Sequence, residues 1–255
     1  MRTSREGRLL KITLDRPEKR NALTTAMCQE LVDQLEGADA DRTLGAMLLD
    51  ADGPAFCAGM DLDESLLPDA AARTAIHEKL FTLGTRLTKP LVAAVQGPAL
   101  AGGMGLAANA HIVIASEEAT FGLTEIRIGM WPFIVYRAVK LAVGERRALD
   151  LSLTGRTFGA DEAEEWGLAQ YVVPRDQLAA KAAHIAGTLA QASPEAIRRG
   201  LTLVNQSRDL GAGETARLAL TLRERLFRSE DYQEGVRAFR EKRAPRWPSL
   251  ESGKS

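Results

Sequence analysis

The sequence predicts an α/β core with mostly parallel strands, followed by a helical region at the C-terminus. Through the first half, short apolar strands alternate with amphipathic helices, an order typical of parallel strands joined by crossover helices. From residue 137 onward helical periodicity dominates. The chain has 255 residues, 45% of them hydrophobic, which suffices for one large core without disulfides. We therefore expect a core over residues 1–195 and a helical C-terminal region over 196–255.

The first half supplies the strands. Leu9–Leu14 alternates apolar and polar residues and predicts a strand, which the charged run 15–20 ends. Thr24 or Thr25 is placed to cap a helix whose apolar face repeats every four residues, at Met27, Leu31 and Leu35. The elements that follow are a strand over 44–49, a helix over 70–88, a strand over Leu91–Val95, a short helix including 106–108, and a strand over 111–115.

The second half is helical apart from one short strand at 172–173. Its apolar spacing predicts helices over 137–143, 145–153, 160–166, 176–191, 194–206, 211–228 and about 231–243. The change to helix alone near residue 195 is the reason for dividing the chain there.

Composition excludes several classes of function. The 33 basic and 34 acidic side chains leave a net charge of −1, and only 5% of residues are aromatic, which argues against nucleic-acid or anionic-membrane partners. The N-terminus does not resemble a signal peptide, and no apolar run approaches the roughly 20 residues that span a bilayer. Cys28 and Cys57 lack metal-ligand spacing and are expected as reduced thiols, so we expect a cytoplasmic protein without a metal site.

Two glycine-containing segments, 54–62 and 97–105, are the candidates for a binding site. Each follows a buried strand and is rich in small residues, which allow a ligand to approach backbone N–H groups closely. Two N–H groups from separate loops that meet at one oxygen stabilise an oxyanion. Tight strand-to-helix turns are the simpler interpretation of each segment alone. Neither segment has the ending of a phosphate-binding P-loop or the dinucleotide fingerprint.

Motifs in a fixed order resemble those of one known family. Residues 55–62 (AFCAGMDL) and 99–103 (ALAGG) resemble the two oxyanion-hole motifs of the enoyl-CoA hydratase/isomerase (crotonase) family. The remaining matching segments are 16–23 (RPEKRNAL), 89–97 (KPLVAAVQG), 121–125 (FGLTE), 153–156 (LTGR), 229–231 (SED) and 239–243 (FREKR). The resemblance extends from about residue 8 to 243 and implies the family's spiral of repeated ββα units.

The resemblance also implies site residues. The N–H groups of Met60 and Gly102 would form the oxyanion hole, and coenzyme A would enter as part of the substrate rather than as a cofactor. The residues implied in coenzyme A binding are Lys19, Arg20, Ala58, Asp61, Leu62 and Lys242, and the resemblance allows Lys242 to come from a neighbouring subunit. A solvated charge is the alternative for the three basic residues. Family members are usually trimers or dimers of trimers, and we expect the same here.

Glu125 is the candidate acid or base. Its position matches one of the two catalytic glutamates of typical family hydratases, and apolar neighbours favour a raised pKa. A solvent-facing glutamate beside Arg127 is the alternative. Gly105 occupies the position of the second glutamate. We expect hydration of a 2-enoyl-CoA; a one-base Δ3,Δ2-enoyl-CoA isomerase and an acyl-CoA-binding protein without catalysis remain open.

Three further side chains are noted near the predicted site. Trp131 and Phe133 are bulky where the family more often has a small, glycine-rich turn, so they either narrow the acyl pocket or pack in the core. His77 lies on the helix predicted over 70–88 and has a possible orientation toward the pocket, but the sequence gives no reason to assign it a role.

Overall fold

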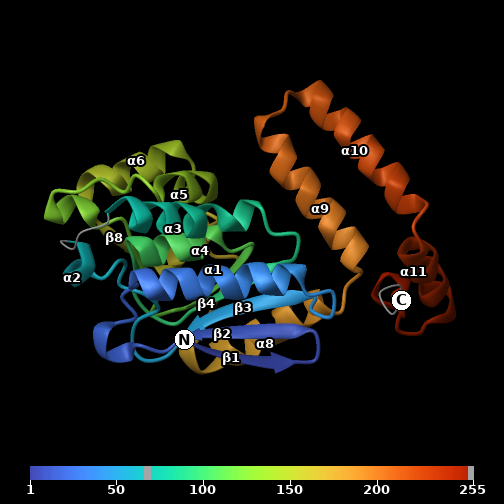
Figure 1. Cartoon of the computed structure of the whole chain (residues 1–255), viewed down its shortest axis with the longest axis horizontal. Helices are drawn as coiled ribbons and strands as arrows, with labels where there is room; N and C mark the ends of the chain where they lie inside the picture. The colour runs from blue at the N-terminus through green and yellow to red at the C-terminus, as the bar shows by residue number, and fades with distance from the viewer. Residues whose placement is uncertain (66–69, 252–255) are drawn as a thin grey trace.

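The computed structural model describes residues 1–65 and 70–251. A six-stranded sheet in the order β1-β2-β3-β4-β6-β9 forms its centre (Figure 1). All neighbouring strands in it are parallel except β1 and β2, which form an antiparallel pair at the edge. The strands are β1 (Arg2–Glu6), β2 (Leu9–Leu14), β3 (Ala46–Ala51), β4 (Leu91–Val95), β6 (Ile112–Ser116) and β9 (Tyr171–Val173).

Helices cover both faces of this sheet, and the central strands are apolar for that reason. All five residues of β4 are buried. On one face lie α1 (Thr25–Ala40), α3 (Ala70–Thr82) and α4 (Gly102–Asn109). On the other lies α8 (Arg175–Ala190), whose alanines at positions 182, 186 and 190 repeat every four residues and pack against the sheet. The crossover arrangement expected from the alternation of strands and helices is confirmed.

The cap of α1 illustrates how local sequence sets these elements. The side chain of Thr24 accepts a hydrogen bond from the N–H of Met27 at 3.1 Å, which satisfies a donor in the first helical turn. Leu31 and Leu35 of the predicted apolar face are buried, as are Cys28 and Val32 beside them. Met27 is only partly buried.

A small second sheet positions the candidate site. It consists of β5 (Ala99–Leu100), β7 (Thr120–Gly122) and β8 (Thr157–Gly159), in the order β5-β7-β8. Leu100 pairs with Gly122 in the parallel register. The short 3-10 helix η3 (Glu125–Ile128) begins after β7, separated from it by Leu123 and Thr124. The start of α4 and the start of η3 are therefore held side by side.

The other helices are mostly in the second half. They are η1 (Pro17–Lys19), α2 (Leu62–Ser65), η2 (Leu83–Thr85), α5 (Tyr136–Val143), α6 (Glu145–Thr154), α7 (Ala160–Glu165), α9 (Pro194–Gln206), η4 (Ser207–Asp209), α10 (Ala212–Phe227), α11 (Glu230–Glu241) and α12 (Pro248–Glu251). Helices α9, α10 and α11 extend away from the sheet (Figure 1). None of the helices over 1–65 and 70–251 has both the length and the apolar character that crossing a bilayer needs.

Candidate active site

Within residues 1–65 and 70–251, the first glycine segment leaves the amide of Met60 without a hydrogen-bond acceptor. Leu23 and Met60 form an isolated parallel bridge. In it the N–H of Leu23 donates to the carbonyl of Gly59, and the N–H of Asp61 donates to the carbonyl of Leu23, both at 2.8 Å. Since this bridge uses the groups on either side of Met60, the N–H of Met60 faces the other way. Among the described residues it donates to no acceptor, so it is available to a ligand oxygen.

The second glycine segment presents the amide of Gly102 at the start of α4. The first N–H groups of a helix have no acceptor within that helix, and the first bond of α4 runs from Gly105 N–H to the carbonyl of Ala101 at 3.0 Å. Ala101 has φ 50° and ψ −118°, a conformation that costs about 1–3 kcal/mol for a residue with a Cβ. Its own N–H is held by the carbonyl of Gly122 at 2.8 Å. The strained turn fixes where the N–H of Gly102 points.

These two amides lie close together because the loops are in contact. A Cβ added to Gly102 would lie 3.5 Å from the Cα of Gly59 and 3.7 Å from its carbonyl carbon, the atom bonded to Met60 N. Gly59 has φ 103°, and a Cβ there would lie 2.9 Å from the Cβ of Ala101 and 3.4 Å from the nitrogen of Gly102. A side chain at residue 59 would therefore strain the loop and crowd the space beside the amide of Gly102.

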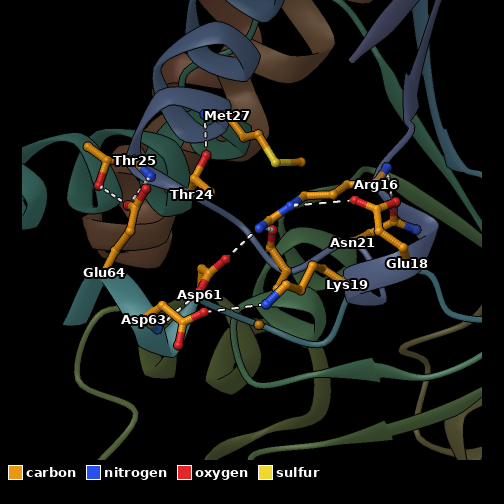
Figure 2. A network of polar contacts seen from close by, with 12 residues as sticks. Arg16, Glu18, Lys19, Asn21, Thr24, Thr25, Met27, Asp61, Asp63 and Glu64 are labelled. Atoms are coloured by element: carbon orange, nitrogen blue, oxygen red, sulfur yellow. Dashed lines mark hydrogen bonds and ion pairs between the residues drawn. The ribbon is translucent and has the colours of Figure 1, made fainter. Parts of the chain in front are cut away.

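Side chains of the loop before α1 contact the first glycine segment and hold it in place. The guanidinium of Arg16 donates to the carboxylate of Asp61 at 2.5 Å, and the ammonium of Lys19 lies 3.4 Å from the carboxylate of Asp63 (Figure 2). The hydrogen bond and charge of Arg16 lower the pKa of Asp61. Buried Asn21 donates to the carbonyls of Asp52 and Ala55. These contacts hold residues 58–63 in the geometry that exposes the Met60 amide.

Glu125 reaches the same place from β7. It is three residues beyond Gly122, whose carbonyl holds the turn before Gly102. Its side chain is buried, with 8% of the residue exposed, and Oε2 has no hydrogen-bond partner within the described part of the chain. Burial raises the pKa of Glu125 from 4.5 to about 6, against a smaller opposing effect of its own backbone N–H. A carboxyl group with this pKa exchanges protons readily near neutral pH.

A pocket of about 570 Å³ joins the three groups, since Met60, Gly102 and Glu125 all line it. The apolar part of its wall consists of Phe81, Ile128, Met130, Pro132, Phe133, Ile134 and Val135. Charged side chains of the first half, Lys19 and Arg20 among them, form another part of the lining. Two unpaired amides and one buried carboxyl group in an apolar pocket can bind a carbonyl oxygen and move a proton at the carbon next to it.

Comparison with known proteins identifies the family. The family model described as Enoyl-CoA hydratase/isomerase matches residues 4–250 of this chain. The chain belongs to this family, the crotonases. It is 38% identical over 248 residues to the mevalonyl-coenzyme A hydratase sidH of Aspergillus fumigatus, covering 94% of this chain and 91% of the relative. It is 36% identical over 250 residues to the enoyl-CoA hydratase EchA19 of Mycobacterium tuberculosis, covering 94% and 93% of the two chains.

Solved structures agree with this assignment. The crystal structure of enoyl-CoA hydratase from Bacillus anthracis matches with a TM-score of 0.91 at 29% identity, over 97% of this chain and 98% of that one. The enoyl-CoA hydratase of Mycobacterium smegmatis matches with a TM-score of 0.90, also at 29% identity, over 96% and 98%. The crotonase fold expected from the sequence is confirmed.

This crotonase has no room for a second carboxylate at Gly105. A Cβ built there would lie 2.5 Å from Cγ1 and 2.9 Å from Cβ of Val135, and 3.0 Å from Cδ1 of Phe81. Val135 is 5% exposed and Phe81 3% exposed, so neither can move aside into solvent without rearranging the core. An apolar wall therefore occupies the position at which the sequence comparison with family hydratases expects a glutamate.

The two bulky aromatic residues of the 129–134 segment have different surroundings. Phe133 lines the pocket with 76% of the residue exposed, so it stands at the mouth and is not core packing. The ring of Trp131 lies 6.4 Å from that of Tyr136, centroid to centroid, and it is not among the residues that line the pocket. Of the two, only Phe133 is placed to restrict an acyl group in this crotonase.

The pocket contains five of the six residues predicted to bind coenzyme A, and the sixth lies elsewhere. Lys19, Arg20, Ala58, Asp61 and Leu62 all line the pocket, but the side chain of Asp61 is engaged by Arg16. Lys242 is the C-cap residue of α11 and does not line the pocket. Helix α11 lies at the opposite end of the molecule from α2, which follows the Met60 loop (Figure 1). Within one subunit Lys242 therefore cannot act with Lys19 and Arg20.

His77 lines the pocket, although no role was predicted for it from the sequence. It lies on α3, one helical turn before Phe81, and both line the pocket. The spacing of four between these residues places them on one helical face. That spacing was visible in the sequence, but which face of α3 meets the site was not.

Proposed function

We propose that this crotonase hydrates a 2-enoyl-CoA thioester. The N–H groups of Met60 and Gly102 bind the thioester oxygen, and Glu125 moves the proton at the α carbon. One observation carries the proposal: two unpaired amides, from loops about 40 residues apart, meet beside a buried carboxyl group in one pocket. The names of relatives at 36–38% identity, an enoyl-CoA hydratase and a mevalonyl-coenzyme A hydratase, also favour hydration.

The chemistry needs this arrangement because negative charge develops on the thioester oxygen when the α carbon loses or gains a proton. Fixed N–H donors stabilise that charge without reorganising during the reaction, and one such donor typically contributes about 10²–10³-fold in kcat. The positive end of α4 acts in the same direction. Met60 contributes its backbone and not its thioether.

Two alternatives remain. A one-base Δ3,Δ2-enoyl-CoA isomerase needs only the oxyanion hole and Glu125, and the blocked position at Gly105 favours it. An acyl-CoA-binding protein without catalysis needs the pocket alone. Either alternative would explain why the second family carboxylate is dispensable.

Turnover assays distinguish the three. We expect purified protein to hydrate a 2-enoyl-CoA, followed by loss of the conjugated thioester absorbance, faster than it converts the matching 3-enoyl-CoA. Mevalonyl-CoA, the compound in the name of the A. fumigatus relative, has no double bond to hydrate and is therefore assayed for the reverse reaction, loss of water. Isomerisation without hydration would favour the one-base isomerase. Tight binding of thioesters without turnover of any would favour the binding protein.

For coenzyme A, we propose that Lys19 and Arg20 contact the nucleotide part and that the backbone over 58–62 contacts pantetheine and adenine. Lys19 is already paired with Asp63, but both side chains are exposed, at 53% and 83%. Such a surface pair contributes about 0–1 kcal/mol, so a phosphate can replace Asp63 as the partner of Lys19. Lys242 would come from a neighbouring subunit.

We further propose that residues 196–255 form the contacts of a homotrimer or a dimer of trimers. Large apolar side chains are exposed on α9, α10 and α11, and Phe239, 86% exposed, is the extreme case. The others on these helices are Val204, Leu220, Phe227 and Tyr232. Exposed apolar side chains gathered on one region favour association. We also propose a cytoplasmic location and a role in fatty acid metabolism.

The assembly is directly measurable. Light scattering on the protein eluting from a sizing column should give a mass of three or six copies of the 27.6 kDa chain. Replacing Phe239 by Asp should shift the population toward smaller species, because a charge cannot be buried unpaired in an apolar contact. A single-copy mass for the unaltered chain at micromolar concentration would contradict the proposal.

A further inference from the structure

His77 lines the candidate pocket together with Phe81, its neighbour one turn later on α3. Phe81, one turn later on the same helical face, is so close to the oxyanion loop that a Cβ on Gly102 would lie 3.2 Å from its Cζ. Helical side chains lean toward the N-terminus of their helix, so His77 extends from Phe81 along the pocket wall. Both side chains line the pocket that contains Glu125.

One ring nitrogen of His77 lacks a hydrogen-bond partner in the described structure. This atom, Nε2, is buried and has no hydrogen-bond partner within residues 1–65 and 70–251. Leaving such a group unsatisfied costs about 1–3 kcal/mol, which a polar occupant of the pocket would relieve. Burial lowers the pKa of His77; the charge of Arg73 lowers it further and that of Glu64 opposes this. The ring is therefore neutral at pH 7, a state in which each ring nitrogen can donate or accept a hydrogen bond according to tautomer.

Two other carboxylates that line the pocket, those of Glu64 and Asp61, already have hydrogen-bond partners. Oε2 of Glu64 accepts hydrogen bonds from the N–H and hydroxyl of Thr25, both at 2.7 Å. The carboxylate of Asp61 binds Arg16. The wall position that a second glutamate would need is filled by Val135 and Phe81. Buried polar atoms with no partner in the described structure remain on two pocket residues, Glu125 and His77.

We propose that His77 holds the attacking water. This inference rests on the proposed function and names the group that replaces the excluded carboxylate. Nε2 of His77 hydrogen-bonds the water that adds to the β carbon, and the water oxygen forms the new bond there as the double bond shifts into the enolate. Glu125 takes the proton that the water loses and delivers it to the α carbon. One water is consumed, Glu125 returns to its starting state, and nothing is oxidised or reduced.

The test compares a reaction that is expected to require His77 with one that is not. Hydration of crotonyl-CoA needs the held water, whereas exchange of the α protons of butyryl-CoA in D₂O, followed by NMR, needs only the oxyanion hole and Glu125. For His77→Leu we expect the kcat of hydration to fall by about 10²-fold, the cost of a misplaced reactant, with α-proton exchange changed by less than about threefold. His77→Gln, which keeps a hydrogen-bonding group, should recover part of the lost hydration. His184→Leu, an exposed histidine on α8, is the matched control.

Each other outcome overturns the inference. An equal loss of hydration and exchange in His77→Leu would mean that His77 only shapes the pocket. A raised KM with unchanged kcat would mean that His77 contributes to binding the thioester and does not hold the attacking water. Undiminished hydration would remove any role. If the unaltered protein exchanges α protons but does not hydrate, the water-holding role fails while enolate chemistry stands; if it does neither, the proposed function itself fails.

Discussion

Replacing Glu125 by Gln is expected to lower kcat/KM for the thioester reaction by about 10²–10⁴-fold, the usual contribution of a positioned acid or base. The amide has nearly the shape of the carboxyl group but cannot carry the proton between water and the α carbon. Because Glu125 is buried beside the two amides and not in the charged part of the lining, acyl-CoA affinity should change little. Steady-state rates and equilibrium binding of a saturated acyl-CoA measure the two effects separately.

The pH dependence of kcat/KM provides a second test of the role of Glu125. As a base Glu125 acts when ionised, so kcat/KM of the unaltered enzyme should fall about tenfold per pH unit below its pKa of about 6 and level off above it. The Glu125→Gln enzyme should not show this fall in kcat/KM below pH 6. Glu117→Gln makes the same change at an exposed residue outside the pocket and should retain both rate and profile. An unimpaired Glu125→Gln enzyme would exclude Glu125 as the proton carrier.

Replacing Gly59 by Ala should have the second-largest effect, a loss of about 10²–10³-fold in kcat, the cost of losing one oxyanion donor. The new Cβ would be 2.9 Å from the Cβ of Ala101 and 3.4 Å from the nitrogen of Gly102. It would displace one of the two amides or occupy the space meant for the thioester oxygen. At φ 103° it would also reduce the free energy of unfolding by about 1–3 kcal/mol.

The variant Gly144→Ala is a control that distinguishes loss of stability caused by backbone strain from loss of activity. Gly144 has φ 85° between α5 and α6, and a Cβ there would meet nothing within 4 Å. This variant should lose similar stability, about 1–3 kcal/mol, while it keeps its kcat. Denaturant unfolding and steady-state kinetics on both variants provide the comparison. Equal activity losses in the two would attribute the effect of Gly59→Ala to general destabilisation.

Strands with strong apolar patterns were predictable, and the short or polar ones were not. Leu9–Leu14 and Leu91–Val95 have the predicted bounds, because both runs are rich in apolar residues that are buried in the sheet. Strand β1 was missed, since all five of its residues are exposed and polar or charged, and pairing with β2 alone defines it. Strands β5, β7 and β8 have two or three residues each, too few for any periodicity.

The part of the candidate site that is defined by sequence motifs was predictable, and the part that depends on packing between helices was not. The family resemblance placed Met60, Gly102 and Glu125, and the structure brings all three to one pocket. That Val135 and Phe81 fill the space beside Gly105 depends on how α3 and the start of α5 pack, which no local motif encodes. The contact of Arg16 with Asp61 joins residues 45 apart in sequence and was equally hidden.

Convergence of the Met60 and Gly102 amides on one thioester oxygen can be observed in a crystal structure with butyryl-CoA bound. We expect this oxygen to lie about 2.7–3.2 Å from the nitrogens of both Met60 and Gly102, with the α carbon facing Glu125. The contradicting result would be a thioester oxygen bound elsewhere, with the amides of Met60 and Gly102 donating to carbonyl groups of the protein itself.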